Sequence, residues 1–73
     1  MGLVSTYYPK IRVLREKSER SQEYIANKIN ISFSAYVRYE RGEREVPFPV
    51  INKLAKYYGV TNDYFTIGAQ KLK

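Results

Sequence analysis

Two helix starts that lie close together constrain this chain more than any other feature of its sequence. Ser21 and Ser32 each precede a helical pattern, and a serine hydroxyl at such a position accepts a hydrogen bond from an amide of the first turn. Asn30 ends the first of the two helices, because asparagine enters the left-handed conformation more readily than most residues. Only Asn30 and Ile31 are left to connect the helices. The helices must therefore cross steeply, since the chain has no length in which to run back along the first one.

Hydrophobic periodicity along the rest of the chain indicates further helices. Apolar residues recur at the spacing of a helical stripe, and Gly42 and Gly59 follow two such stripes, where glycine adopts the left-handed conformation that ends a helix. The expected helices are Lys10 to Lys17, Gln22 to about Ile29, Ser32 to Arg41, about Pro49 or Val50 to Tyr58, and a short helix capped by Thr61. The predicted fold class is all-α, a compact bundle of about five short helices.

The length of the chain limits how many domains it can hold. Its 73 residues suffice for one hydrophobic core and not for two. Pro9 suits the first turn of a helix and marks the expected start of the domain. We expect residues 1–8 to be an N-terminal extension, residues 9–67 to form the domain, and residues 68–73 to be a frayed tail.

Charge and composition narrow the function classes. The 13 Lys and Arg against 7 Asp and Glu give a net charge of +6, which favours a polyanionic partner; the alternative is that the charge only keeps a small domain soluble. Catalysis is not expected, because the chain has no His, no Cys and one Asp from which to build a nucleophile, a general base or a metal site. No apolar run approaches the roughly 18 residues of a membrane span and no secretion signal is seen, so we expect a cytoplasmic protein without cofactors.

The segment SQEYIANKINISFSAYVRYERG, from Ser21 to Gly42, resembles the helix-turn-helix of phage-repressor and Cro-type (XRE-like) regulators of bacteria and phages. The positions that carry the resemblance, in an ungapped register, are Gln22, Ala26, Asn30, Glu40 and Gly42. Similarity extends from about Ile11 to Phe65. The resemblance implies a lambda-repressor-like fold and sequence-specific binding of double-stranded DNA in transcription regulation. The helix from about Ser32 to Arg41 would then enter the major groove, which is about 12 Å wide.

The resemblance places base-edge contacts on one part of that helix, at Phe33, Ser34, Val37 and Arg38. Arg38 is the strongest candidate, because its planar guanidinium can donate two hydrogen bonds to guanine; the alternative is a solvated or phosphate-touching charge. Phe33 departs from the polar or long basic residues usual at its position. Its ring can pack on a thymine methyl group, serve folding, or contact a protein partner.

Phosphate contacts are assigned by the same resemblance to Gln22, Ser32, Arg41 and Arg44. Gln22 opens a helix whose free amides face outward, so its side chain and those amides can hold a phosphate, although glutamine is equally common on any wet helix surface. Arg41 and Arg44 flank Gly42, where the loop of the family meets the DNA backbone.

Four residues are assigned to structure rather than to binding. Arg15 and Glu40 match positions that the family pairs as a partly buried salt bridge between helices, so Glu40 is not expected to act as a catalytic acid. Tyr36 and Tyr39 stand where the family commonly has branched aliphatic residues. We expect both rings in the core with their hydroxyls at its rim, and not as platforms on which bases stack.

The identity of the partner stays open between two classes. The alternative to DNA is a protein, bound by an antitoxin or interaction module on the same fold through an interface that is nearly insensitive to salt. Membrane-surface binding is disfavoured, because the apolar faces are needed to build the core. We also expect a homodimer on half-sites about 34 Å apart. The resemblance places its interface in the segment that contains Tyr57, Phe65 and Ile67.

Overall fold

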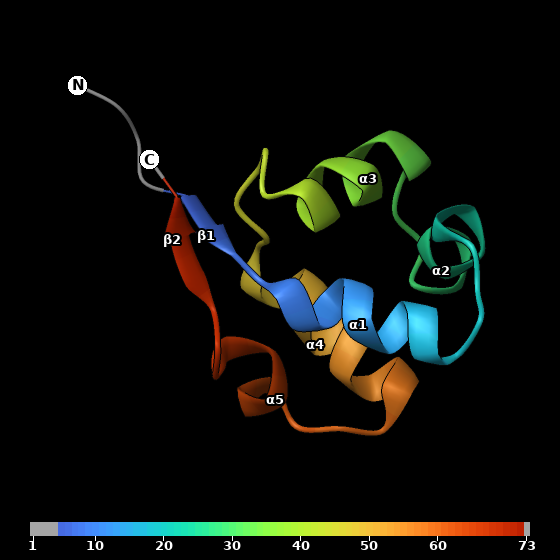
Figure 1. Ribbon diagram of the computed structural model, residues 1–73. Coiled ribbons are helices and arrows are strands. Elements are labelled where there is room, and N and C mark those ends of the chain that lie inside the picture. The colour runs from blue at the N-terminus through green and yellow to red at the C-terminus, as the bar shows by residue number, and fades with distance from the viewer. Residues whose placement is uncertain (1–4, 73) are drawn as a thin grey trace.

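The computed structural model describes residues 5–72 as five helices and one two-stranded ribbon (Figure 1). The helices are α1 (Pro9–Lys17), α2 (Gln22–Lys28), α3 (Phe33–Arg41), α4 (Phe48–Tyr58) and α5 (Asn62–Thr66). The strands are β1 (Ser5–Tyr7) and β2 (Gln70–Leu72). The predicted bundle of five short helices is confirmed. Within the described range, no helix has the length and apolar character needed to cross a bilayer.

The two serine caps and the tight connection are confirmed. Ser21 Oγ accepts a hydrogen bond from the Tyr24 amide at 3.0 Å, and Ser32 Oγ accepts one from the Ala35 amide at 3.1 Å. Asn30 lies in the left-handed region with φ at 62°. Local hydrogen bonds and one backbone conformation therefore determine where α2 ends and α3 begins.

The starts of α4 and α5 differ in detail from the prediction. Helix α4 begins at Phe48, because Pro47 occupies the N-cap and Pro49 fits within the first turn, where a missing N–H breaks no helical hydrogen bond. Helix α5 follows Thr61 as expected, but the Thr61 side chain makes no capping hydrogen bond. The sequence pattern therefore places both helices without setting their first-turn geometry.

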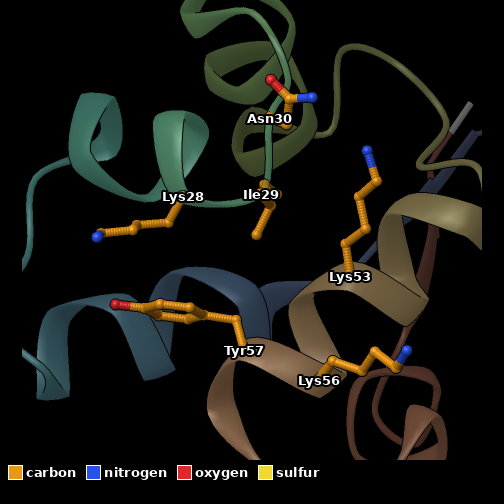
Figure 2. Close-up of a pocket in the computed structure, with 6 residues that line it drawn as sticks. All are labelled: Lys28, Ile29, Asn30, Lys53, Lys56 and Tyr57. Carbon is orange, nitrogen blue, oxygen red and sulfur yellow. The ribbon is translucent and has the colours of Figure 1, made fainter.

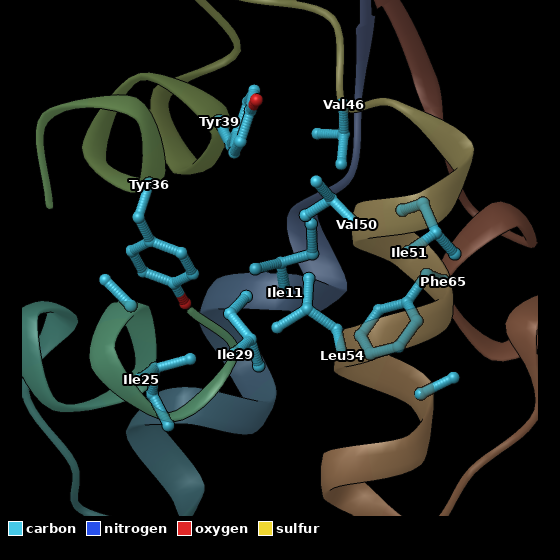
Figure 3. Packing of buried hydrophobic residues seen from close by; sticks show 12 residues of the cluster. Ile11, Ile25, Ile29, Tyr36, Tyr39, Val46, Val50, Ile51, Leu54 and Phe65 are labelled. Carbon is cyan, nitrogen blue, oxygen red and sulfur yellow. The ribbon is translucent and has the colours of Figure 1, made fainter. Parts of the chain in front are cut away.

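The core lies between the α2–α3 pair and the helices α1, α4 and α5 (Figure 3). Its buried hydrophobic residues are Ile11, Ile25, Ala26, Ile29, Tyr36, Tyr39, Val46, Val50, Ile51, Leu54, Ala55 and Phe65. Tyr36 and Phe65 are the largest of its fully buried side chains. Ala26 is also fully buried, and its small side chain lets α3 approach α2 closely. Helix α3 is thus anchored along one face only.

The two ends of the described chain pair with each other. Strands β1 and β2 are antiparallel, with Ser5 opposite Leu72, Thr6 opposite Lys71 and Tyr7 opposite Gln70. The Thr6 amide also donates to Glu45 Oε1 at 2.7 Å, which ties the ribbon to the loop between α3 and α4. The expectation of a frayed tail is therefore wrong up to Leu72, because pairing between distant segments leaves no local pattern in either of them. The expectations for residues 1–4 and 73 fall outside the described residues.

Candidate nucleic-acid interface

The four residues assigned to base contacts share one outer face of α3. Phe33, Ser34 and Arg38 are exposed, and Val37 is partly buried. Their spacing along the helix places them side by side on its surface. Phe33 keeps 49% of its surface accessible, so its ring does not serve the core. Arg38 takes part in none of the ion pairs or side-chain hydrogen bonds of the described residues, which leaves its guanidinium available to a ligand.

The opposite face of α3 is buried. Tyr36 is fully buried, and Tyr39 and Glu40 keep 8% and 4% of their surfaces accessible. Both rings lie in the core, as predicted. The Tyr36 hydroxyl does not reach the rim, however, because the ring points from α3 into the core, and the hydroxyl is buried without a well-aligned hydrogen-bond partner (Figure 3). Burial, and then the neighbouring Glu40 carboxylate, raise the pKa of Tyr36.

A buried ion pair holds this face of α3 against α1. Arg15 donates from Nε to Glu40 Oε2 at 2.5 Å and from Nη2 to Glu40 Oε1 at 3.1 Å. Such a two-point contact fixes both distance and orientation. The two side chains keep only 13% and 2% of their surfaces accessible. Burial by itself would raise the pKa of Glu40, but the hydrogen bonds led by Arg15 outweigh it and hold this pKa below its ordinary value. Glu40 is therefore an ionised anchor inside the fold.

Gln22, the first residue of α2, is turned toward the same carboxylate. Its Nε2 donates to Glu40 Oε1 at 3.0 Å, so the side chain completes the ion-pair network instead of standing free in solvent. No sequence signal pointed to this contact, because Gln22 and Glu40 are far apart along the chain. Both residues border a polar cleft of about 610 Å³. The cleft is lined by Tyr7, Arg12, Arg15, Gln22, Glu40, Arg41 and Glu43. Tyr7 and Arg12 were not singled out from the sequence.

The other three residues assigned to phosphate lie at the two ends of α3. Ser32 Oγ accepts the capping hydrogen bond and keeps its own hydrogen to donate. Arg41 Nη1 lies 3.7 Å from Glu43 Oε2, and since both side chains are exposed this pair holds the arginine only weakly. Arg44 is exposed in the loop that follows. The two arginines therefore lie at the C-terminal end of α3 beside two exposed glutamates, Glu43 and Glu45.

The residues expected at a dimer interface differ in exposure. Phe65 is fully buried, with its ring against those of Tyr58 and Tyr64, so its assignment to an interface is wrong. Tyr57 and Ile67 keep 37% and 64% of their surfaces accessible. The sequence alone could not show that Phe65 is buried, because a five-residue helix is too short to show a hydrophobic period.

Known proteins are similar to this chain in sequence over the helical part of the fold. The helix-turn-helix family model matches residues 11–65. The chain is similar to the cryptic phage CTXphi transcriptional repressor RstR of Vibrio cholerae, with 41% identity over 51 residues that cover 70% of this chain and 46% of that protein. It is also similar to the uncharacterized HTH-type transcriptional regulator YobD of Bacillus subtilis (strain 168), with 34% identity over 58 residues that cover 80% of this chain and 52% of that protein. The chain thus spans about half the length of these curated relatives.

No solved structure matches the chain. The family match begins in α1 and ends in α5, and it includes the two serine caps, the left-handed turn residue and both partners of the buried ion pair. The matched segment is also the one that holds the exposed face of α3. This chain therefore belongs to the helix-turn-helix family.

Proposed function

We propose that this chain binds double-stranded DNA in a sequence-specific manner and regulates transcription, with α3 lying in the major groove. The observation that carries the proposal is the outer face of α3, where Phe33, Ser34 and Arg38 are exposed on a helix whose opposite face is locked into the core. A helix with its side chains fits a groove about 12 Å wide. Membership of the family and the transcriptional repressor among the relatives support the same function.

Each residue of this face has a role that follows from its chemistry. The Arg38 guanidinium donates two hydrogen bonds to guanine O6 and N7, a contact worth roughly 1 to 3 kcal/mol of discrimination. The Ser34 hydroxyl donates or accepts at the edge of a base. Phe33 and Val37 present apolar surface to thymine methyl groups.

Phosphate contacts fix the register of the helix in the groove and carry no sequence information. Ser32 donates from its hydroxyl at the start of α3, and Arg41 and Arg44 supply charge at the other end. Gln22 contributes through the backbone amide at the start of α2, because its side chain is engaged with Glu40.

Selection of bound sequences from random duplex DNA tests the proposal. The full chain is expected to enrich one motif, and Arg38→Ala is expected to lose the preference at one base pair of that motif. Lys17→Ala is the matched control, since Lys17 is an exposed cation on α1, and it should keep the whole motif. If the unmodified chain enriches nothing, sequence-specific binding is wrong. If Arg38→Ala keeps the motif unchanged, only the role of Arg38 is wrong.

Two copies of the chain are proposed to bind each site, because one domain of 73 residues offers limited contact area. Their half-sites would lie about 34 Å apart. With Phe65 removed from the expected interface, Ile67 is its most exposed member. Sedimentation with a palindromic duplex should find two chains per duplex, and a strictly one-to-one complex would contradict the proposal.

A protein partner is the second candidate, and the exposure of Phe33 favours it. An aromatic ring at 49% exposure contributes to a surface that another protein can cover. An antitoxin or interaction module would bury this ring in a largely apolar interface with little salt dependence. Binding to DNA instead weakens with salt, with a log–log slope of about −0.9 for each phosphate contact. The salt dependence of binding therefore separates the two functions.

A further inference from the structure

A basic cleft of about 450 Å³ lies between the end of α2, the turn that follows it and the outer face of α4 (Figure 2). Its lining residues are Lys28, Ile29, Asn30, Lys53, Lys56 and Tyr57. Three of these residues are lysines and none is acidic. Each ion pair of the described residues uses an arginine, so no carboxylate pairs with the three ammonium groups. Lys28 Nζ also lies 5.4 Å from the centroid of the Tyr24 ring, and the ammonium groups of Lys53 and Lys56 have no such aromatic contact among the described residues.

The cleft adjoins the start of α3. Asn30 precedes the cap residue Ser32 by two positions, and its left-handed backbone belongs to the turn that leads into α3. In Figure 2 the Lys53 side chain rises from α4 toward Asn30, whereas Lys28 and Lys56 extend to either side. An ammonium group and a carboxamide that face one space can both donate to an oxygen of a single anion. Lys53 and Asn30 thus present two kinds of hydrogen-bond donor to the same cleft.

The dimensions of α3 relate this cleft to the proposed DNA surface. The helix has 9 residues, which give it a length of about 13 Å, close to the width of about 12 Å of the major groove. Arg41 and Arg44 supply cations at its C-terminal end, and Lys53 supplies one beside its N-terminal end. Cations placed toward both ends of a helix in the groove can meet backbone phosphates on either side of the base pairs that the helix contacts. An acidic protein segment would also meet the lysines, but their place beside the helix that contacts bases favours the backbone of the same duplex.

We propose that Lys53 and Asn30 bind a phosphate of the DNA backbone next to the base pairs that α3 contacts, and that Lys28 and Lys56 strengthen this site electrostatically. The proposal rests on the proposed function and extends it, because it adds α4 to the surface that touches DNA. Most affinity for duplex DNA comes from such phosphate contacts, each of which releases counterions.

The salt dependence of duplex binding tests this site, measured with the full chain on a mixed-sequence duplex of about 20 base pairs. Lys53→Gln should flatten the log–log slope by about 0.9 and weaken binding about eightfold at about 0.1 M salt, because one phosphate contact is lost. Lys53→Arg should keep the slope. Asn30→Gly preserves the left-handed backbone and removes the carboxamide, so it should weaken binding without changing the slope.

Lys17→Gln is the matched control, since it removes one exposed lysine from α1, and its slope should stay within about 0.3 of the unmodified chain. An unchanged melting temperature shows that each variant is folded. Equal slopes for Lys53→Gln and the unmodified chain would overturn this site while leaving the proposed function standing. If Lys53→Gln keeps the slope but binds a polyglutamate peptide more weakly than the unmodified chain does, the phosphate site is also overturned. The cleft is then assigned to an acidic protein. Failure of the unmodified chain to bind any duplex would overturn the proposed function itself.

Discussion

Phe33 and Tyr36 stand three residues apart on α3, and both are aromatic, yet Phe33 keeps 49% of its surface accessible and Tyr36 keeps none. Arg38 and Glu40 show the same contrast between charged groups, since Arg38 is exposed and Glu40 keeps 4%. Residue type therefore does not separate the two faces of this helix. Position within the helical period does, because one face packs into the core while most residues of the other face are exposed.

The largest loss of stability should come from removing the cation of the buried Arg15–Glu40 ion pair. Arg15→Met leaves the Glu40 carboxylate buried without its cation, and the free energy of unfolding should fall by about 3 to 5 kcal/mol in chemical denaturation. Arg12→Met is the matched control on the same helix, because the Arg12–Glu16 pair keeps 60% and 55% of its side-chain surfaces accessible. The control should cost less than about 1 kcal/mol. Equal losses in the two variants would show that the buried face has no special part in stability.

Low pH should lower the free energy of unfolding by a smaller amount, through the same ion pair. The folded chain holds the pKa of Glu40 below its ordinary value of 4.5, so the ionised carboxylate stabilises the fold above that pH. This contribution is lost as pH falls through the folded-state pKa, because protonation breaks the pairing with Arg15. Unfolding free energies measured between neutral and strongly acidic pH should fall more steeply for the unmodified chain than for Glu40→Gln. Parallel curves would contradict the burial of a charged Glu40.

A still smaller effect is expected at the hydroxyl of Tyr36. Tyr36→Phe removes a buried hydroxyl that has no well-aligned partner, so the free energy of unfolding should stay the same or rise by up to about 1 kcal/mol. Thermal denaturation measures the change. A loss of more than about 1 kcal/mol would mean that the hydroxyl donates a strong hydrogen bond to Glu40 in solution.

The smallest effect on stability is expected on the outer face. Phe33→Ser removes a ring that the core does not use, so the free energy of unfolding should change by less than about 0.5 kcal/mol. Binding to the duplex enriched by selection should nevertheless weaken. A clear loss of stability would instead place Phe33 among the residues that serve folding.

Local features of the fold were predictable from the sequence, and contacts between distant segments were not. Ser21, Ser32 and Asn30 act on their own neighbourhood, so their residue types were enough to place α2, the turn and α3. The pairing of β1 with β2 joins the two ends of the described chain, and no local pattern encodes it.

In the candidate site, too, some features could be predicted from the sequence and others could not. The outer face of α3 follows from helical spacing, and the resemblance paired Arg15 with Glu40. The donation from Gln22 to Glu40 and the meeting of Lys53 and Asn30 in one cleft depend on how separate helices pack, which residue types alone do not specify. The inward direction of the Tyr36 hydroxyl has the same origin.

The most direct test of the two-faced helix is a titration of the isotope-labelled chain with the duplex enriched by selection, followed through backbone amide chemical shifts. We expect the largest shifts at Phe33, Ser34 and Arg38, with further shifts at the ends of α3. The amides around Phe65 should change little, because that residue is buried on the far side of the core from α3 (Figure 3). Largest shifts in α5, with α3 unaffected, would contradict the central claim that the outer face of α3 contacts DNA.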